Sequence, residues 1–292
     1  MVHITQGGIR DSIIAMVEEK GNIPPLPDIL VRLESKIEDP KSNISDIAIL
    51  IETEPILAGR MIQLSNSVFF SGGANKVDNL SQAIIRLGLK MILDLAYTLE
   101  VPKLFMKGKG INQNRFWQHS LAVALLSRIL NQRLKGLVVE QDLCYLSGLM
   151  HDIGIMVFNY LIPEEYSAFL KEVRGMETPL HKLEIQKFGI SHAELGSMFI
   201  EKWWPVPEEV VTSVGKHFLG MSNQGKKYPL LLVVIMANAI ANTYDMGNGI
   251  SDWEEPLNYN FLMQQGLSRE ILDEMVEETR ESLFLAKEVL YK

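Results

Sequence analysis

Apolar residues recur three or four positions apart along almost the whole of this chain, the spacing that gives a helix one apolar face. The segment that starts at Ser81 is a clear case, with apolar residues at Ala83, Ile84, Leu87, Met91, Leu95 and Leu99. No stretch alternates in the way that a half-buried strand does. The sequence therefore predicts an all-α fold.

Prolines, glycines and capping residues divide this pattern into helices. We expect helices over residues 9–19, 27–37, 45–52, 54–65, 81–99, 116–130, 140–150, 163–174, 179–188, 192–203, 207–217 and 229–244, and a last one that begins near Ser268. Ser45 and Ser81 are the expected N-caps of two of them. The glycine- and lysine-containing segment 105–114 is the expected joint between two halves of the chain.

Composition narrows the class of protein. The chain has 292 residues, of which 47% are hydrophobic and 22% charged, as in a globular protein with one large or two medium cores. Its single cysteine, Cys144, allows no intrachain disulfide, and the start of the chain lacks a secretion signal, so we expect a cytoplasmic protein. The longest apolar run, 229–241, is too short to cross a bilayer. A net charge of -8 argues against nucleic acid as a partner.

His151 and Asp152 stand side by side between an apolar run and Gly154. Burying two such groups is costly unless they coordinate or hydrogen-bond to something. Imidazole and carboxylate together suit a divalent metal ion, which can activate water for hydrolysis. His119 lies on a core-like helix and could reach this pair, which makes His119, His151 and Asp152 the candidate metal ligands.

His192 and His217 each lie at a predicted helix end. They could contact a second ion or a phosphate there. The alternative is helix capping or an interaction with the helix dipole, which is worth up to about 2 kcal/mol. His3 and His181 have no recognisable partners in the sequence and are expected at the surface.

These residues resemble the HD superfamily of metal-dependent phosphohydrolases, in which a histidine, a histidine-aspartate doublet and a distal aspartate hold one ion. More of the chain is similar to one branch of it, the HDOD domain, an HD-related output domain of bacterial signalling proteins. The motifs that carry this similarity are Ile23-Pro24-Pro25-Leu26-Pro27, Glu38-Asp39-Pro40, Thr53-Glu54-Pro55-Ile56-Leu57, Leu64-Ser65-Asn66-Ser67 and Gln82-Ala83-Ile84-Ile85-Arg86-Leu87-Gly88.

The resemblance implies a multi-helical HD-like bundle with an N-terminal helical subdomain. It predicts an N-terminal helix over 1–19, an HDOD domain over 20–245 and a C-terminal helical extension over 246–292. The domain would comprise a helical part, 20–110, and an HD-like part, 111–245. His119, His151 and Asp152 fall on inherited ligand positions, and His192 and His217 fall where dinuclear relatives place further ligands.

Three positions depart from the pattern of active relatives. Asn238 stands at the distal aspartate position, Ile155 replaces a lysine that often follows the doublet's glycine, and Phe218 stands where a second histidine commonly follows the first. An amide is neutral, so Asn238 removes one formal charge from the ligand set and should weaken metal binding.

The expected function is that of a bacterial signal-transduction output or regulatory module that binds other signalling proteins. We expect it to have no efficient hydrolase activity and to require no cofactor. The alternative is a metal-dependent phosphohydrolase for nucleotides or cyclic dinucleotides, with iron, manganese, magnesium or zinc. In that alternative Asn238, Glu194 or Asp245 would complete the ligand shell.

Two further features suggest contacts with proteins. Trp203 and Trp204 are adjacent, and one of them could anchor an interface, because tryptophan is enriched at binding hot spots. The alternative is that both cover the end of a helix. The last helix carries an apolar stripe, which should dock on the body of the protein or on a second copy of the chain.

Overall fold

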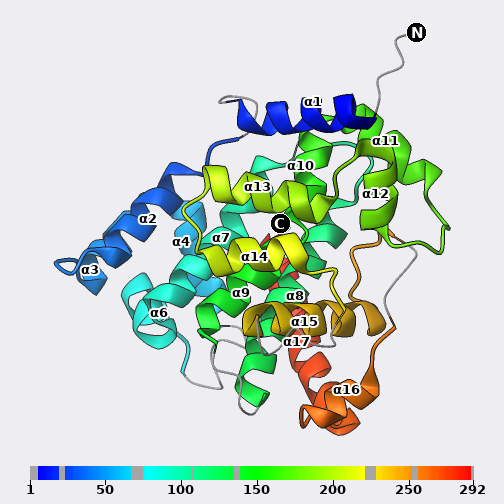
Figure 1. The fold of residues 1–292 in the computed structure, drawn as a ribbon. Helices are drawn as coiled ribbons and strands as arrows, with labels where there is room; N and C mark the ends of the chain where they lie inside the picture. Colours follow the sequence, from blue (N-terminus) through cyan, green and yellow to red (C-terminus); the bar gives the residue numbers. More distant parts are fainter. Residues whose placement is uncertain are drawn as a thin grey trace. The chain divides into compact units, whose positions relative to one another are not determined.

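The computed structural model of the chain describes residues 6–19, 24–66, 75–106, 108–134, 139–220, 228–251 and 256–290. Every regular element within these ranges is a helix (Figure 1). This confirms the all-α fold predicted from the spacing of apolar residues. The chain forms two compact units, each built from two separate segments: unit 1 is Met1–Pro25 with Phe105–Leu272, and unit 2 is Leu26–Leu104 with Asp273–Lys292.

Unit 2 is built around five helices that pack against one another. They are α2 (Asp28–Glu38), α3 (Ile44–Glu52), α4 (Pro55–Ser65), α6 (Leu80–Leu87) and α7 (Leu89–Leu104). Apolar side chains such as Leu33 and Met61 fill its core, and the Tyr97 hydroxyl donates a hydrogen bond to Glu34.

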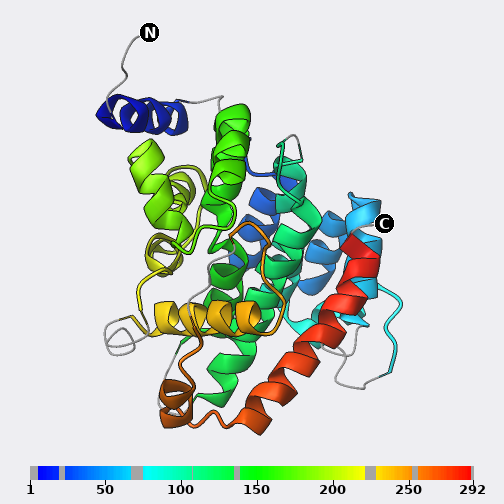
Figure 2. The ribbon, with the colours of Figure 1, turned by 90° about the vertical axis from the view of Figure 1, so that its right-hand side faces the viewer.

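The long helix α17 (Arg269–Leu290) is drawn in red in Figure 2. Most of it belongs to unit 2. Leu272, Met275 and Val276 of its apolar stripe are buried within the chain, which is one of the two arrangements expected for this stripe.

Unit 1 holds the predicted site residues. Its helices are α1 (Gln6–Glu18), α8 (Gln113–Arg133), α9 (Gln141–Met150), α10 (Ile153–Leu161), α11 (Pro163–Glu172), α12 (Leu180–Phe188), α13 (His192–Trp203), α14 (Glu208–Lys216), α15 (Pro229–Thr243) and α16 (Tyr259–Gln264). The pairs α8 and α9, α10 and α13, and α13 and α14 pack closely, and α15 lies beside α8 and α9 in both ribbon views (Figures 1 and 2).

Two of these close contacts depend on glycines. A Cβ atom on Gly148 would lie 2.7 Å from the Ala124 Cα, so α9 can approach α8 only without a side chain there. A Cβ atom on Gly154 would lie 1.8 Å from the His192 carbonyl oxygen, so α10 meets α13 backbone to backbone. Both glycines therefore allow the two helices that flank the His151-Asp152 doublet to pack closely against their neighbours.

The structure corrects three local expectations. The N-caps are Asn43 and Asn79, whose side chains accept from Asp46 N and Gln82 N, instead of Ser45 and Ser81. The helix expected over 81–99 is two helices, because Gly88 has a φ of 81°, which ends α6 before α7 begins. Helices α10 and α16 were not expected from the sequence.

Among the helices that the structure describes, none has the length and apolar character that a bilayer crossing requires.

Candidate metal centre

The His151-Asp152 doublet forms the junction between two helices of unit 1. His151 follows the last residue of α9, and Asp152 is the N-cap position of α10. The chain turns at this point, so the two side chains of adjacent residues can face the same space. The His151 Nε2 and Asp152 Oδ2 atoms lie 3.3 Å apart.

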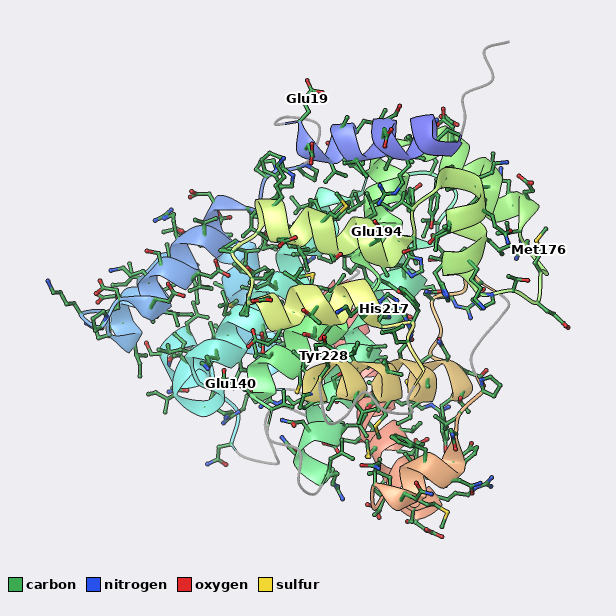
Figure 3. All side chains as sticks on the ribbon, in the orientation of Figure 1. Glu19, Glu140, Met176, Glu194, His217 and Tyr228 are labelled. Atoms are coloured by element: carbon green, nitrogen blue, oxygen red, sulfur yellow. The ribbon has the colours of Figure 1, made fainter. Side chains whose placement is uncertain are left out.

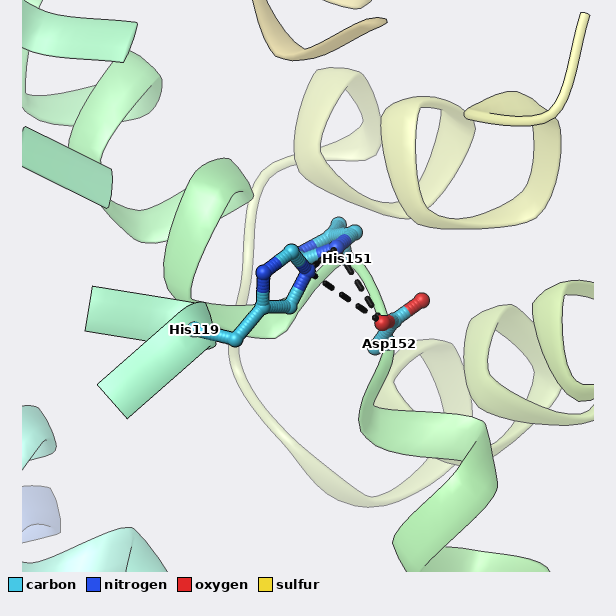
Figure 4. A group of neighbouring side chains, drawn as sticks. All are labelled: His119, His151 and Asp152. Carbon is cyan, nitrogen blue, oxygen red and sulfur yellow. Dashed lines mark hydrogen bonds and ion pairs between the residues drawn. The ribbon is translucent and has the colours of Figure 1, made fainter. Parts of the chain in front are cut away.

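His119 reaches this corner from α8, as the sequence predicted. Its Nε2 atom lies 3.3 Å from His151 Nε2 and 3.7 Å from Asp152 Oδ2 (Figure 4). We call His119 and His151 the inner pair.

His192 and His217 come together on the other side of the same carboxylate. His192 is the first residue of α13, and His217 follows the last residue of α14 (Figure 3). Their Nε2 atoms lie 3.3 Å apart and face Asp152 Oδ1 at 3.7 and 3.3 Å. We call them the pocket pair. Asp152 therefore lies between two histidine pairs, with one oxygen toward each.

All four imidazoles are oriented by an acceptor at Nδ1. Nδ1 of His119, His151 and His217 faces a backbone carbonyl at 2.7 to 2.8 Å, and Nδ1 of His192 faces the Glu184 carboxylate at 2.6 Å; the three carbonyls are those of Met246, Gly148 and Val214. Since a carbonyl or carboxylate only accepts, each Nδ1 carries a proton, and a ring in its neutral form presents a lone pair at Nε2.

The spacing of these atoms fits a metal ion. When both rings of a pair are neutral, their two Nε2 atoms cannot hydrogen-bond across 3.3 Å, so a cation suits each gap. Ligand atoms about 2.0 to 2.2 Å from a tetrahedral ion are about 3.3 to 3.6 Å apart, close to the separations within each group. Both groups, His119 with His151 and Asp152, and Asp152 with His192 and His217, are compact enough to hold an ion.

Burial and charge set the protonation of the cluster. Burial lowers the pKa of His119 to about 4, and burial also lowers the pKa of His217. Burial alone would raise the pKa of Asp152, but His151 and His217 beside it hold this pKa well below its usual value. Burial opposes the charged form of His192 as well, yet the Glu184 carboxylate raises its pKa. Asp152 is thus an anion, the lowered pKa values of His119 and His217 favour their neutral forms, and the raised pKa of His192 favours its charged form.

Behind His192 lies a buried hydrogen-bond chain. Glu184 is fully buried on α12; its Oε2 accepts from both the backbone N–H and Nδ1 of His192, and its Oε1 accepts from the Tyr166 hydroxyl at 2.6 Å. The Ser191 hydroxyl caps α13 by accepting from Glu194 N, which fixes the start of this helix. The position of His192 is therefore fixed both by its two hydrogen bonds to Glu184 and by the cap at the start of its helix.

The segment after α15 completes the other side of the site. Met246 supplies the carbonyl that orients His119, and the Asn248 side-chain amide donates to Asp152 Oδ2 at 2.8 Å. Arg115 donates to the Gly247 carbonyl and packs against Gly249, whose φ of 70° places it in the left-handed region.

A cavity of about 120 Å³ opens onto the cluster from the pocket pair's side. Its lining includes Asp152, His192, His217, Asn238 and Asn248, and His119 and His151 are not part of it. Asn238 Oδ1 accepts from Asn242 Nδ2 at 3.2 Å. Asp152 is the only acidic side chain of the lining among the described residues.

Other predicted residues lie elsewhere. Glu194 pairs with Arg10 of α1, and Asp245 is exposed, so neither belongs to the cavity lining. His181, expected at the surface, is half-buried, stacks on Phe218 with ring centroids 4.3 Å apart and lines the cavity. That expectation was wrong for His181, and His3 lies outside the described residues.

The two adjacent tryptophans have different environments. Trp204 is buried and packs against Phe199 at 4.8 Å, whereas Trp203 donates from Nε1 to the Val17 carbonyl of α1. An interface at Trp203 and Trp204 stays a prediction.

Sequence reasoning missed Glu184, Tyr166, Asn248 and the Met246 carbonyl. Glu184 did leave a signal, because it stands four residues from both Leu180 and Phe188 on the buried face of α12. A charged residue in an apolar stripe needs a partner inside the protein. A backbone carbonyl such as that of Met246 leaves no comparable signal.

Comparison with known proteins supports the relationship seen in the motifs. A family model for the HDOD domain matches residues 23–218. An uncharacterized protein of Treponema pallidum (strain Nichols) is 26% identical over 218 residues, which are 74% of this chain. The chain spans 42% of that relative's length.

Several solved structures share the fold. An HDOD domain protein of unknown function from Geobacter sulfurreducens has a TM-score of 0.77 at 23% identity, over 97% of this chain and 99% of its own. A Shewanella amazonensis protein provisionally called a phosphohydrolase has a TM-score of 0.72 at 20% identity, over 95% and 98%. The MmoQ response regulator of Methylococcus capsulatus has a TM-score of 0.50 at 22% identity, over 87% and 97%. At these identities the likeness shows the fold alone.

Proposed function

This chain belongs to the HDOD domain family, and on that premise we propose that it is a signal-transduction output module. It regulates other proteins by binding them, and its histidine cluster holds a divalent ion without efficient hydrolysis of phosphate esters. The response regulator among the proteins of similar fold supports a signalling role.

One observation supports the proposal that the chain does not hydrolyse phosphate esters efficiently. Asp152 is the only acidic side chain of the described cavity lining. Two divalent ions would bring four positive charges, and Asp152 supplies one negative charge at the ligand positions. Phosphate ester hydrolysis by a metal pair requires both ions to be held around the attacking and leaving oxygens. Asn238, at the position where the family resemblance expects an aspartate, adds no charge to the set.

An activity assay tests whether the chain hydrolyses phosphate esters. The full chain is incubated with Mn²⁺, Fe²⁺ or Mg²⁺ and a panel of cyclic dinucleotides, nucleotides and phosphomonoesters. We expect no turnover above that of the His151→Ala/Asp152→Ala double variant. Asn238→Asp restores a carboxylate and should raise metal affinity about tenfold or more. Robust wild-type turnover that the double variant loses would refute the proposal.

The binding role needs its own test. Cross-linking and co-purification from the native host should recover a defined protein partner with the wild type and with the double variant alike. A chain that recovers no specific partner in any growth condition contradicts an output role through protein binding.

A second candidate is a metal-dependent phosphohydrolase. The observation that favours it is the convergence of four Nε2 atoms on one carboxylate at metal-like spacing. Elemental analysis of protein purified without chelator, followed by the assay above, separates the two functions. Near-stoichiometric metal together with turnover favours the enzyme, and metal without turnover favours the output module.

A further inference from the structure

The two histidine pairs beside Asp152 look alike in their distances but differ in charge. Three of the four imidazoles are backed at Nδ1 by neutral backbone carbonyls, and only His192 is backed by a carboxylate, that of Glu184. A carboxylate behind a ligand histidine raises the basicity of Nε2 and adds a negative charge near the ion. This difference favours a cation at the pocket pair over one at the inner pair.

Asn248 acts on the inner side of Asp152. Its amide donates a hydrogen bond to Oδ2, the oxygen that faces His119 and His151. A donor at this oxygen withdraws part of its charge from a cation in the inner pair. Oδ1, which faces the pocket pair, has only the two imidazoles as partners among the described contacts.

Solvent access also differs between the two pairs, and it likewise favours the pocket pair. His151 and His119 are 0% and 1% exposed and do not line the cavity, whereas His192 and His217 are 5% and 6% exposed and do. An ion in the inner pair would lose nearly all of its water with only one shared carboxylate to compensate. An ion in the pocket pair keeps coordination positions open to the cavity for water or an anionic oxygen.

We propose that the first divalent cation binds between His192, His217 and Asp152 Oδ1, and that Glu184 is the positioning residue that creates this preference. The inference rests on the metal-binding part of the proposed function. It reverses the order implied by the family resemblance, in which the doublet and His119 hold the ion.

Calorimetric titration of the metal-free full chain with Zn²⁺ tests the order. His217→Ala and His119→Ala are a matched pair, since each removes one imidazole with a carbonyl-backed Nδ1, one from each side. We expect His217→Ala to weaken the first binding event about 10- to 100-fold and His119→Ala to change it by less than about threefold. The reverse pattern overturns the proposal.

Glu184→Gln tests the origin of the preference, because glutamine keeps the size of the side chain and removes its charge. The first Zn²⁺ should bind about tenfold or more weakly, while the variant remains helical by circular dichroism. Asn248→Ala is the complementary change: it removes the donor to Asp152 Oδ2 and should strengthen the second event more than the first. An unchanged first affinity in Glu184→Gln contradicts the assigned role.

A measurement on the wild type keeps the test independent of variant folding. In ¹⁵N-labelled protein with less than one equivalent of Zn²⁺, the Nε2 resonances of His192 and His217 should change on coordination before those of His119 and His151. Change at His119 and His151 first overturns the inference and leaves the proposed function standing. Failure to bind Zn²⁺ in any assay overturns the inference together with the metal-binding part of the proposed function.

Discussion

Each oxygen of Asp152 faces its own pair of histidines, and Asp152, at the start of α10, thereby links this helix to four others of unit 1. Burial of such a cluster is stable only when its charges are matched. Beside the Asp152 anion, burial favours the neutral forms of His119 and His217, and the Glu184 carboxylate favours the charged form of His192. The protonation of individual histidines should therefore be visible in the pH dependence of stability.

His119 gives a prediction with a definite sign. Its pKa is lowered from 6.5 to about 4 by burial, so between these values the unfolded chain binds a proton that the folded chain does not. The free energy of unfolding should therefore decrease as pH falls from 6.5 toward 4, by about 3 kcal/mol in full. Urea unfolding with a chelator present, at a series of pH values, measures this loss.

His119→Gln is the control, because glutamine does not titrate. His192, whose pKa is raised, contributes stability that is present at low pH and lost as pH rises through its folded pKa, and it is common to both proteins. Subtracting the two curves isolates His119. A variant with the same pH dependence as the wild type would show that His119 is not neutral in the folded protein.

At the scale of elements, the approach of α10 to α13 determines where His192 lies relative to Asp152. Gly154→Ala places a Cβ atom 1.8 Å from the His192 carbonyl oxygen, so the two helices must separate. We expect a loss of about 3 kcal/mol in unfolding free energy and weaker Zn²⁺ binding, both measured on the same preparation.

Gly59→Ala in α4 is the matched control. Nothing lies within 4 Å of the Cβ atom it would add, so alanine should be neutral or stabilise the helix by roughly 0.5 to 1 kcal/mol. Equal stability of Gly154→Ala and the wild type would mean that the contact between α10 and α13 is looser than described.

Helix positions were largely predictable, because their ends carry local signals. The expected range 192–203 matches α13, and prolines mark the first residues of α4, α11 and α15. The break at Gly88 was missed because the apolar spacing continues through it. Helix α10 was missed because it follows the doublet directly: Asp152 stands at its N-cap position, but the Asp152 carboxylate faces the histidines and makes no capping hydrogen bond.

The candidate site was predictable only in part. His119, His151 and Asp152 could be named because histidine-aspartate doublets are unusual in apolar surroundings, and the structure brings them together with His192 and His217. The direction of each Nε2 atom depends on acceptors distant in sequence. Met246 is 127 residues from His119 and contributes a carbonyl, which every residue has.

At the scale of the whole molecule, we expect metal binding to stabilise unit 1 and to leave the stability of unit 2 unchanged. All candidate ligands belong to unit 1, so Zn²⁺ at 100 times its dissociation constant should stabilise this unit by about 2.7 kcal/mol. Hydrogen exchange should slow in α8, α9, α10, α13, α14 and α15 and remain unchanged in α2, α3, α4, α6 and α7.

The His151→Ala/Asp152→Ala variant is the control and should show no Zn²⁺-dependent change in either unit. Slower exchange of equal size in α2, α3, α4, α6 and α7 of the wild type would contradict the prediction that Zn²⁺ stabilises unit 1 alone.

The division of the chain also affects its folding during translation. Unit 2 combines residues 26–104 with residues 273–292, so its two segments leave the ribosome far apart in time. At a synthesis rate of about 5 to 20 residues per second, the second segment follows roughly 10 to 40 seconds after the first. Residues 26–104 therefore remain without the second segment of their unit until residues 273–292 have been synthesised.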